Sequence, residues 1–555
     1  MSFGFGLGFP RASSFNLEAA VLALFAGTPG YADDLEDWST LFQDAAGTTP
    51  VTALEQPVGL ILDKSQGLVL KPELVTNGDF SNGTTGWTSI NATLSAVSGV
   101  LRITKTSVNG QARTTVPTVI GKVYRVKATL TNRSVAAVVS YLDLGSSAGG
   151  LQYARTAVAG LGVLNGSVTV YFTAAATTAY LGLYSAEGTG FEEWDNISVR
   201  ELPGNHAFHK PGDVLARAVI SRRVNLLTKT EDFADSYWSK NVAVSVTNGS
   251  GYSTVSVPNT IGGGINIVFR QSISTLPRLY YSLMVRGPVG RSITLADDYG
   301  NSTVAFTGEW QKINFTSSDG GGGFHQFYIR TASANQTYTF DITQASLVPA
   351  DLAALPYQRV NTTTDYDGDA SKFPTFLRTD GVDDCYQTNA INFTGTDKMT
   401  VVAGVRKLSD ATQEFLGLSA VWTGSPGTFA AYSESGVVQY ASASRGSAAA
   451  AANQVASVTS GYAAPVSTVL SSSHDIAGDL TTLRLNGVAQ TPATGDKGTG
   501  NFGNYPLYFF RRGGTTLPFN GFYFGSLIIG RTLNASELAL VERYMAQKTK
   551  TVTLA

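Results

Sequence analysis

The sequence predicts a mostly β fold, made of tandem antiparallel β-sandwiches of the jelly-roll type. Residues 74–80 (LVTNGDF), with Trp87 soon after, are echoed by residues 226–233 (LLTKTEDF), with Trp238 soon after. A repeat at this spacing indicates a duplicated domain, because solenoid units are only roughly 20–50 residues long. Around these markers, short apolar runs alternate with turn-rich stretches, as in sandwiches. A short N-terminal anchor and a C-terminal helix packed on the last sandwich complete the prediction.

The two copies also end alike, with residues 194–199 (WDNISV) in the first and residues 340–348 (FDITQASLV) in the second. Gly, Asn and Ser positions separate their strand-like runs, which include residues 123–130, 136–142, 167–172 and 178–183 in the first copy and 280–286, 292–295, 309–315 and 327–331 in the second. We therefore place the first jelly roll at residues 71–202 and the second at residues 223–357, with a linker at residues 203–222.

A third sandwich is predicted for the last part of the chain, residues 358–555. Asn486 and Gly487 lie between apolar runs and indicate a two-residue hairpin, because a type I′ turn needs a positive φ twice. A helix follows near the end of the chain. Asn534 is its expected N-cap, and Glu537 completes a capping box.

The first residues alternate large apolar side chains with glycine. Phe3, Phe5, Leu7 and Phe9 would share one face of a strand with period 2. This pattern fits either an anchoring strand that pairs with another subunit or an unstructured terminus. A short helix is expected at residues 17–26, between an asparagine cap and a Gly/Pro stop.

Composition restricts the classes of function. Charged residues are 14% of the chain and the net charge is −2, without a long Lys/Arg cluster, so no nucleic-acid partner is expected. Cys385 is the single cysteine, which excludes an intrachain disulfide. No apolar run reaches the roughly 18–20 residues of a membrane span, and no signal peptide is evident. We therefore expect synthesis in a cytoplasm without export and no insertion into a membrane.

Patterns typical of enzymes occur without the context that their chemistry needs. Residues 498–503 match G-x-G-x-x-G, but a strand-like run follows where a helix should begin. Residues 473–475 (SHD) are consecutive and cannot adopt the geometry of a catalytic triad. Adjacent carboxylates such as Asp383 and Asp384 would point to opposite faces of a strand, whereas glycosidases need facing carboxyls. The sequence therefore predicts no catalytic activity.

A metal site is not predicted either, and Asp365, Asp367 and Asp369 are only weak candidates. The glycine of this segment is at its fourth position, which excludes an EF-hand loop. A looser surface ion site remains an alternative to a plain interdomain turn. We expect no cofactor.

Several segments resemble known families. Residues 38–64 (beginning WSTLFQDAAGTTPV) resemble an N-terminal module that recurs in tail-fibre and appendage proteins of bacteriophages and prophages. The opening and closing texts of residues 71–202 resemble carbohydrate-binding jelly rolls of the galactose-binding-like superfamily. Residues 376–384 (FLRTDGVDD), with the later run 483–488, resemble a concanavalin-like (laminin-G-like) sandwich. The helical ending is typical of phage lectin-like domains.

These resemblances imply a structural phage virion appendage, which would be a tail fibre, a tail spike or a head fibre. Residues 1–70 would attach it to other virion structural proteins, and the sandwiches would bind host-surface glycans or receptors. The resemblance also implies a homotrimer on the surface of the particle. Two alternatives remain: a glycan-degrading enzyme with accessory binding modules, and a bacterial surface adhesin, which would require export.

Aromatic rings are the expected tool for sugar binding, because a ring face packs on a pyranose. Tyr141, Tyr153, Tyr171 and Tyr184 are the candidates, since they could line a concave face of the first jelly roll. The tryptophans in the opening and closing texts are expected in the cores instead.

Overall fold

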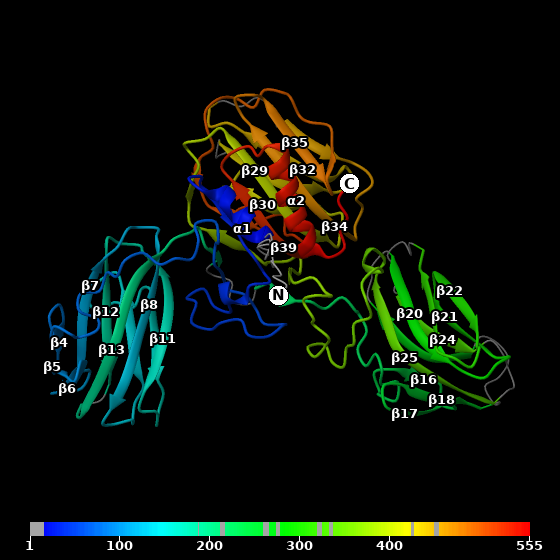
Figure 1. Cartoon of the computed structure of the whole chain (residues 1–555), viewed down its shortest axis with the longest axis horizontal. Helices are drawn as coiled ribbons and strands as arrows, with labels where there is room; N and C mark the ends of the chain where they lie inside the picture. Colours follow the sequence, from blue (N-terminus) through cyan, green and yellow to red (C-terminus); the bar gives the residue numbers. More distant parts are fainter. Residues whose placement is uncertain are drawn as a thin grey trace, which may run out of the picture.

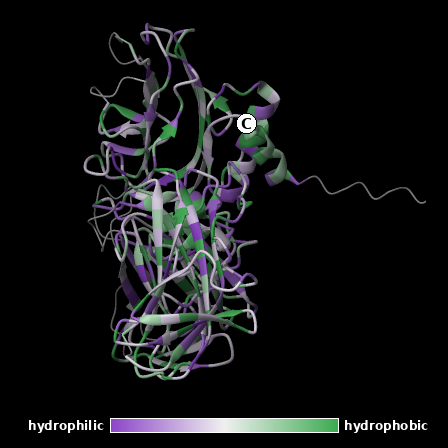
Figure 2. Ribbon diagram, turned by 90° about the vertical axis from the view of Figure 1, so that its left-hand side faces the viewer, coloured by the Kyte–Doolittle hydropathy of each residue, from purple (hydrophilic) through white to green (hydrophobic). Residues whose placement is uncertain are grey.

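The computed structural model describes residues 16–186, 188–210, 217–258, 266–273, 278–318, 325–331, 337–422, 427–448 and 454–555. Two jelly rolls flank a third sandwich (Figure 1). The predicted mostly β fold of antiparallel sandwiches with a C-terminal helix is confirmed. Hydrophobic and hydrophilic residues are interspersed along the strands (Figure 2), as sheets with one buried face require. The predicted anchor residues Phe3, Phe5, Leu7 and Phe9 lie outside the described residues.

The first jelly roll consists of two five-stranded sheets, with strand orders β10-β9-β12-β7-β4 and β11-β8-β13-β6-β5. Its strands are β4 (Thr88–Ile90), β5 (Ala92–Val97), β6 (Val100–Lys105), β7 (Gln111–Pro117), β8 (Val123–Arg133), β9 (Ser140–Gly145), β10 (Ala154–Ala159), β11 (Gly166–Thr173), β12 (Thr178–Ser185) and β13 (Phe191–Leu202). Alternate residues of both sheets face one core, which includes Val126, Leu142, Leu183 and Trp194.

The second jelly roll repeats this arrangement strand for strand, with orders β22-β21-β24-β19-β16 and β23-β20-β25-β18-β17. Its strands are β16 (Ser239–Lys240), β17 (Ser245–Asn248), β18 (Ser253–Val257), β19 (Asn266–Ile273), β20 (Leu279–Arg286), β21 (Ser292–Asp297), β22 (Gly300–Ala305), β23 (Gln311–Thr316), β24 (His325–Thr331) and β25 (Tyr338–Pro349), followed by the 3-10 turn η3 (Ala350–Leu352). The identical order of ten strands identifies the two modules as copies of one domain.

The tryptophans behave as the sequence predicts. Trp87 packs on Phe80 with ring centroids 5.5 Å apart, and Trp238 packs on Phe233 at 4.8 Å. Both indoles, and that of Trp194, belong to buried core clusters. The tryptophans of the repeated sequence motifs therefore pack in the cores and do not provide an exposed ring for sugar binding.

The third sandwich draws its strands from three separate parts of the chain. One sheet has the order β15-β26-β39-β29-β34-β35-β36, with β1 also on β39, and the other has the order β2-β3-β14-β27-β38-β30-β31-β32-β33. The strands are β1 (Gly30–Ala32), β2 (Leu41–Phe42), β3 (Leu60–Ile61), β14 (Ala207–His209), β15 (Val219–Ser221), β26 (Phe376–Arg378), β27 (Tyr386–Thr388), β29 (Lys398–Lys407), β30 (Gln413–Leu418), β31 (Thr428–Glu434), β32 (Val438–Arg445), β33 (Gln454–Val458), β34 (Val466–Asp475), β35 (Leu480–Leu485), β36 (Val488–Ala489), β38 (Leu507–Phe509) and β39 (Gly521–Ile529), while β28 (Ile391–Asn392) and β37 (Asn504–Tyr505) form a small separate pair.

This arrangement differs from the expectation that residues 1–70 and the linker 203–222 are units of their own. Strands β1, β2 and β3 of the first segment and β14 and β15 of the linker lie within the sheets of the third sandwich. Their runs of two or three residues are too short to be recognised in the sequence, and their partners are far away along the chain. Both jelly rolls are therefore insertions between strands of the third sandwich.

The expected helix at residues 17–26 forms as α1 (Leu17–Leu22) and the 3-10 turn η1 (Ala23–Phe25). Its apolar side is not left for a partner protein. Val21 and Phe25 are buried in one cluster with Val541 and Met545 of helix α2 (Ala535–Thr549). This helix is thus part of the third sandwich.

Helix α2 begins as predicted. The Asn534 side chain accepts from the backbone N–H of Glu537 at 3.0 Å, and the Glu537 carboxylate accepts from the Asn534 backbone N–H at 2.9 Å. The predicted Asn486-Gly487 turn has φ values of 53° and 82°. Among the described residues, no helix has both the length and the hydropathy of a membrane span.

Two buried carboxylates connect the segment that contains β1, β2 and β3 to the rest of the third sandwich. Asp33 accepts hydrogen bonds from the hydroxyl of Tyr523 at 2.5 Å, the hydroxyl of Tyr31 at 3.1 Å and the backbone N–H of Ser526 at 2.8 Å. Burial raises the pKa of Asp33 to about 7, although these donors act in the opposite direction.

The second carboxylate, Asp63, joins three segments. It accepts from the backbone N–H groups of Ala32 at 2.9 Å, Ser65 at 2.8 Å and Asn205 at 2.6 Å. The Asp63 backbone N–H in turn donates to Nδ1 of His206 at 2.9 Å. Burial lowers the pKa of His206 to about 4, so this ring is neutral and can accept.

We predict a pH-dependent effect of Asp33→Asn. Because the pKa of Asp33 is raised to about 7, the folded chain keeps a proton that the unfolded chain loses near its ordinary pKa of about 4. The stabilising contribution is fully present below about pH 4 and is lost as the pH rises through about 7. The free energy of unfolding of the parent relative to the variant should therefore fall by up to about 4 kcal/mol over this range.

Urea denaturation at a series of pH values measures this difference. Thr52→Ala is the control, because Thr52 is exposed and has no titratable group, so its substitution should give a difference that does not depend on pH. A flat difference for Asp33→Asn would contradict the prediction.

Candidate functional site

Two tyrosine rings lie next to each other on the outer surface of the first jelly roll. Tyr141 of β9 and Tyr184 of β12 are directly opposite in register. Their centroids are 6.2 Å apart and their planes differ by 32°. The adjacent Leu142 and Leu183 belong to the core, so the two rings point away from it. Both side chains are partly exposed.

Arg155 of β10 lies over this pair. Its guanidinium carbon is 5.2 Å from the Tyr141 centroid and 4.8 Å from the Tyr184 centroid. Its Nε and Nη2 donate to the two oxygens of Asp143 at 2.8 and 2.7 Å. The Asp143 carboxylate raises the pKa of Arg155. The guanidinium therefore stays charged, with 40% of the Arg155 side chain exposed.

The surface beside the rings is formed by a glycine and by polar side chains. Gly182 of β12 pairs with Arg113 of β7, and a Cβ at Gly182 would come no closer than 3.5 Å to its neighbours. The Arg113 Nε donates to Oε1 of Gln111 at 2.9 Å, and the Tyr184 hydroxyl donates to Asn109 at 2.8 Å. A Cβ at Gly182 would thus make only ordinary van der Waals contacts, between an aromatic pair and fixed polar groups.

We call the set Tyr141, Asp143, Arg155, Gly182 and Tyr184 the tyrosine–arginine face. A pyranose has an apolar C–H surface and a rim of hydroxyl groups. The two rings offer apolar contact area with polar tips, while the guanidinium offers donors and the carboxylate acceptors. This arrangement is suited to binding a sugar without any chemical step.

The four tyrosines named from the sequence do not form one site. Tyr141 and Tyr184 meet on the tyrosine–arginine face, but Tyr153 and Tyr171 line a cavity between the first jelly roll and the third sandwich. The reason is that Tyr171 is in β11, which belongs to the other sheet of the jelly roll. Its side chain packs on Phe42 of the third sandwich, with ring centroids 5.2 Å apart.

The tyrosine–arginine face is not duplicated in the second jelly roll. Strands β21 and β24 correspond to β9 and β12, and their core residues include Ile293, Leu295, Phe327 and Ile329. The intervening outward residues include Ser292, Thr294, Gln326, Tyr328 and Arg330. Arg330 lies over Tyr328, with its guanidinium carbon 4.5 Å from the ring centroid. The core pattern is thus preserved while the outer surface differs.

A comparable cluster lies on the other sheet of the second jelly roll, and the sequence did not indicate it. The guanidinium carbon of Arg286 is 4.9 Å from the Trp310 ring and 5.7 Å from the Tyr252 ring. Its Nε and Nη2 donate to Asp341 at 3.0 and 2.6 Å. These residues are distant in the sequence, so only the strand register brings them together.

The weak metal candidates interact with a lysine. The Lys372 ammonium lies 3.7 Å from Asp367 and 3.4 Å from Asp369, whereas the backbone carbonyl of Asp365 accepts from Asn361. Within the described ranges, no three His, Cys, Asp or Glu side chains come close enough to hold a metal ion.

Cys385 and His474 are enclosed in the third sandwich. Cys385 is buried, and burial raises the pKa of its thiol to about 12. His474 is buried among Ser442, Ser472 and Thr481, and desolvation lowers its pKa to about 3. Both groups are therefore neutral near pH 7 and lie away from the surface.

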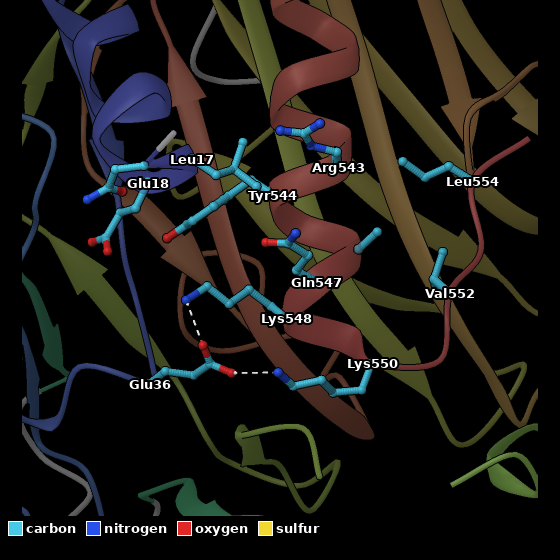
Figure 3. A pocket seen from close by; sticks show the side chains of 12 residues that line it. Leu17, Glu18, Glu36, Arg543, Tyr544, Gln547, Lys548, Lys550, Val552 and Leu554 are labelled. Carbon is cyan, nitrogen blue, oxygen red and sulfur yellow. Dashed lines mark hydrogen bonds and ion pairs between the residues drawn. The ribbon is translucent and has the colours of Figure 1, made fainter. Parts of the chain in front are cut away.

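A surface pocket of about 830 Å³ lies between α1, α2 and the last residues of the chain. Figure 3 shows α1 on one side of α2 and Val552 and Leu554 on the other. Three of its charged groups pair with one another, since Glu36 accepts from Lys548 at 3.0 Å and lies 3.6 Å from Lys550. This pocket therefore lies where α1 and the C-terminal residues pack on α2.

No protein-family model and no curated protein matches the chain. Among solved structures, it is similar to the N-terminal tandem CBM22 domain of Xyn10C from Paenibacillus barcinonensis, with 12% identity, a TM-score of 0.19 and coverage of 51% of this chain and 97% of that one. It is also similar to the CBM40 of the Ruminococcus gnavus IT-sialidase bound to α2,3-sialyllactose (18% identity, TM-score 0.22, 26% and 83% covered). A further match is the enzymatically active domain of tailspike protein 2 from bacteriophage CBA120 (10% identity, TM-score 0.24, 33% and 28% covered). At these low TM-scores the likenesses decide neither function nor ligand.

Proposed function

We propose that this chain is a non-catalytic structural appendage of a phage particle and that it binds host-surface glycans through the tyrosine–arginine face. The observation that carries glycan binding is the pair of outward rings, Tyr141 and Tyr184, beneath a guanidinium held by Asp143. The phage-like text at residues 38–64 supports the assignment to a virion, where the chain would be a tail fibre, a tail spike or a head fibre.

The architecture supports a role in display. Both jelly rolls are inserted into the third sandwich and lie on opposite sides of it (Figure 1). Their outer surfaces are thus presented from a common support. A bacterial surface adhesin would use similar surfaces but would need export to the cell surface.

The alternative of a glycan-degrading enzyme needs two carboxyl groups across an accessible cleft. The carboxyls whose pKa values burial raises to about 7 are Asp33, Asp384 and Glu414. All three are at most 5% exposed, and the Arg512 Nε donates to Glu414 at 2.7 Å. Their surroundings favour structural roles for these carboxyls.

We predict that Tyr141→Ala and Tyr184→Ala each weaken binding to host capsule or lipopolysaccharide about 10- to 100-fold. Each loses the burial of one ring, which is of the order of 1.5–3 kcal/mol when the side chain is fully covered. Gly182→Arg should block binding as well, because a long side chain would extend from this position and cover the surface between the rings and Arg113. Affinity electrophoresis in gels that contain the host polysaccharide measures the retardation.

Tyr328→Ala is the matched control in the second jelly roll and should leave this binding unchanged. Thermal melts of all four variants show whether each is folded. Unaltered binding by folded Tyr141→Ala, Tyr184→Ala and Gly182→Arg variants would rule out the tyrosine–arginine face.

We predict that the purified protein does not hydrolyse host capsule or lipopolysaccharide. The physical reason is the burial of the carboxyls with raised pKa values described above. Incubation followed by measurement of new reducing ends tests this, with a known glycosidase as the positive control. Reducing ends that accumulate in proportion to protein concentration would favour the enzyme alternative.

For assembly, we propose a homotrimer that is attached to other virion proteins through residues 1–15. We assign the attachment to residues 1–15 because α1 and β1 are part of the third sandwich. Deleting residues 1–15 should therefore preserve the melting temperature but abolish incorporation into particles, as measured by immunoblots of purified virions. Incorporation at normal copy number, or a stable monomer by light scattering, would contradict the respective part of this proposal.

A further inference from the structure

A cavity of about 390 Å³ lies between the first jelly roll and the third sandwich. The jelly roll contributes Tyr153 and Tyr171 to its lining, and the third sandwich contributes His209 of β14, Gln387 of β27 and the following Asn389. Its volume is within the range of roughly 300–1,000 Å³ that is typical of small-molecule sites.

Direct contacts fix the two walls relative to each other. The Tyr171 backbone N–H donates to the carbonyl of Ala46 at 2.7 Å. The Tyr171 ring packs on Phe42 and belongs to a buried apolar cluster with Leu60. At Gly47, whose φ is +64°, a Cβ would lie 2.3 Å from the same ring. The junction is therefore tightly packed beside the cavity, and the cavity is a preformed feature of it.

The aromatic part of the lining is held in place. The Tyr153 ring stacks on Phe172, with centroids 4.7 Å apart and 26° between the planes. The Tyr153 hydroxyl oxygen accepts from the backbone N–H of Ala175 at 3.0 Å, which leaves the hydroxyl hydrogen available to another acceptor. A ring with a fixed position costs a ligand little conformational entropy on binding.

The polar part of the lining consists of amides, hydroxyls and the imidazole of His209. The carboxamide of Gln387 forms no hydrogen bond with any described residue, and that of Asn389 makes one long contact, 3.5 Å, to the Thr173 hydroxyl. Gln152 adds a third carboxamide at the edge of the jelly roll. None of the twelve lining residues is an aspartate, glutamate, lysine or arginine.

We propose that this interdomain cavity binds a neutral pyranose residue, in a second site that is distinct from the tyrosine–arginine face. Carboxamides both donate and accept, as sugar hydroxyls do, and the partly exposed Tyr153 ring offers a face for the apolar surface of the sugar. Without a lysine or arginine in the lining to neutralise it, an anionic sugar would lose its hydration without compensation. The site therefore selects neutral sugars, in contrast to the ionised groups of the tyrosine–arginine face.

Saturation-transfer NMR on the full chain tests this inference. The probes are D-glucose, D-galactose and N-acetyl-D-glucosamine, with D-glucuronate as the charged counterpart. We expect saturation transfer to at least one neutral sugar and a several-fold weaker effect for glucuronate. The absence of transfer to all three neutral sugars, or equal transfer to glucuronate, would overturn the proposal.

Two variants locate the binding. Ala45 lines the cavity and is exposed, so Ala45→Trp should obstruct the cavity and abolish the signal without disturbing a core. Gln387→Ala combined with Asn389→Ala should weaken binding at least fivefold. The double variant Tyr141→Ala and Tyr184→Ala is the matched control and should retain the signal. Thermal melts verify folding of each variant.

The outcomes separate this site from the tyrosine–arginine face. If folded Ala45→Trp and the Gln387→Ala/Asn389→Ala variant both bind neutral sugars normally, the cavity is not the site. If the Tyr141→Ala/Tyr184→Ala control loses the signal instead, the sugar binds at the tyrosine–arginine face, and the cavity proposal fails while the proposed function stands.

Discussion

Two buried carboxylates, those of Asp33 and Asp63, hold the first described strands of the chain in the third sandwich. A carboxylate removed from water is tolerated only when donors surround it. The donors here come from distant segments: Tyr523 and Ser526 for Asp33, and Asn205 for Asp63. Because both carboxylates must reach these partners, the chain between the segments has to leave the third sandwich and return to it. The two jelly rolls are the parts of the chain that leave the third sandwich and return to it, so their positions depend on these carboxylate contacts.

Ion pairs lie beside these carboxylate contacts. Lys548 donates to Asp34 at 2.7 Å and to Glu36 at 3.0 Å, and Lys64 lies 3.6 Å from Asp34. Such pairs add little net stability when exposed, and breaking one that is buried is costly because it leaves an unpaired charge. The side chains of Asp34 and Lys548 are only 5% and 11% exposed. Apolar packing of α1 on α2 therefore supplies the stabilisation, while the ion pairs specify which segments meet.

The sequence predicted the features that local chemistry determines. The repeated tryptophans, the Asn486-Gly487 turn and the Asn534 cap each depend on a few neighbouring residues, and each is where it was expected. The strands β1, β2, β3 and β14 were missed because they are two or three residues long and pair with distant segments. For the same reason Arg155 and Asp143 were not recognised, since only the register of β10 against β9 brings them together. Tyr171 was grouped with the wrong partners because its strand packs on another domain.

The comparison of the two jelly rolls explains how one fold can carry different surfaces. In each strand the inward residues must fill a core of fixed volume, whereas the outward residues face no such constraint. The aromatic–arginine–carboxylate cluster accordingly lies on the β9–β12 sheet of the first module and on the opposite sheet, around Trp310, of the second. Two weak sites on modules that share one support act together when both can reach the same surface, since the second binding step becomes intramolecular. The insertion of both modules into one sandwich limits their relative freedom. Under the proposed function, geometry would therefore determine, as much as the affinity of the tyrosine–arginine face, how strongly the chain holds a glycan-covered surface.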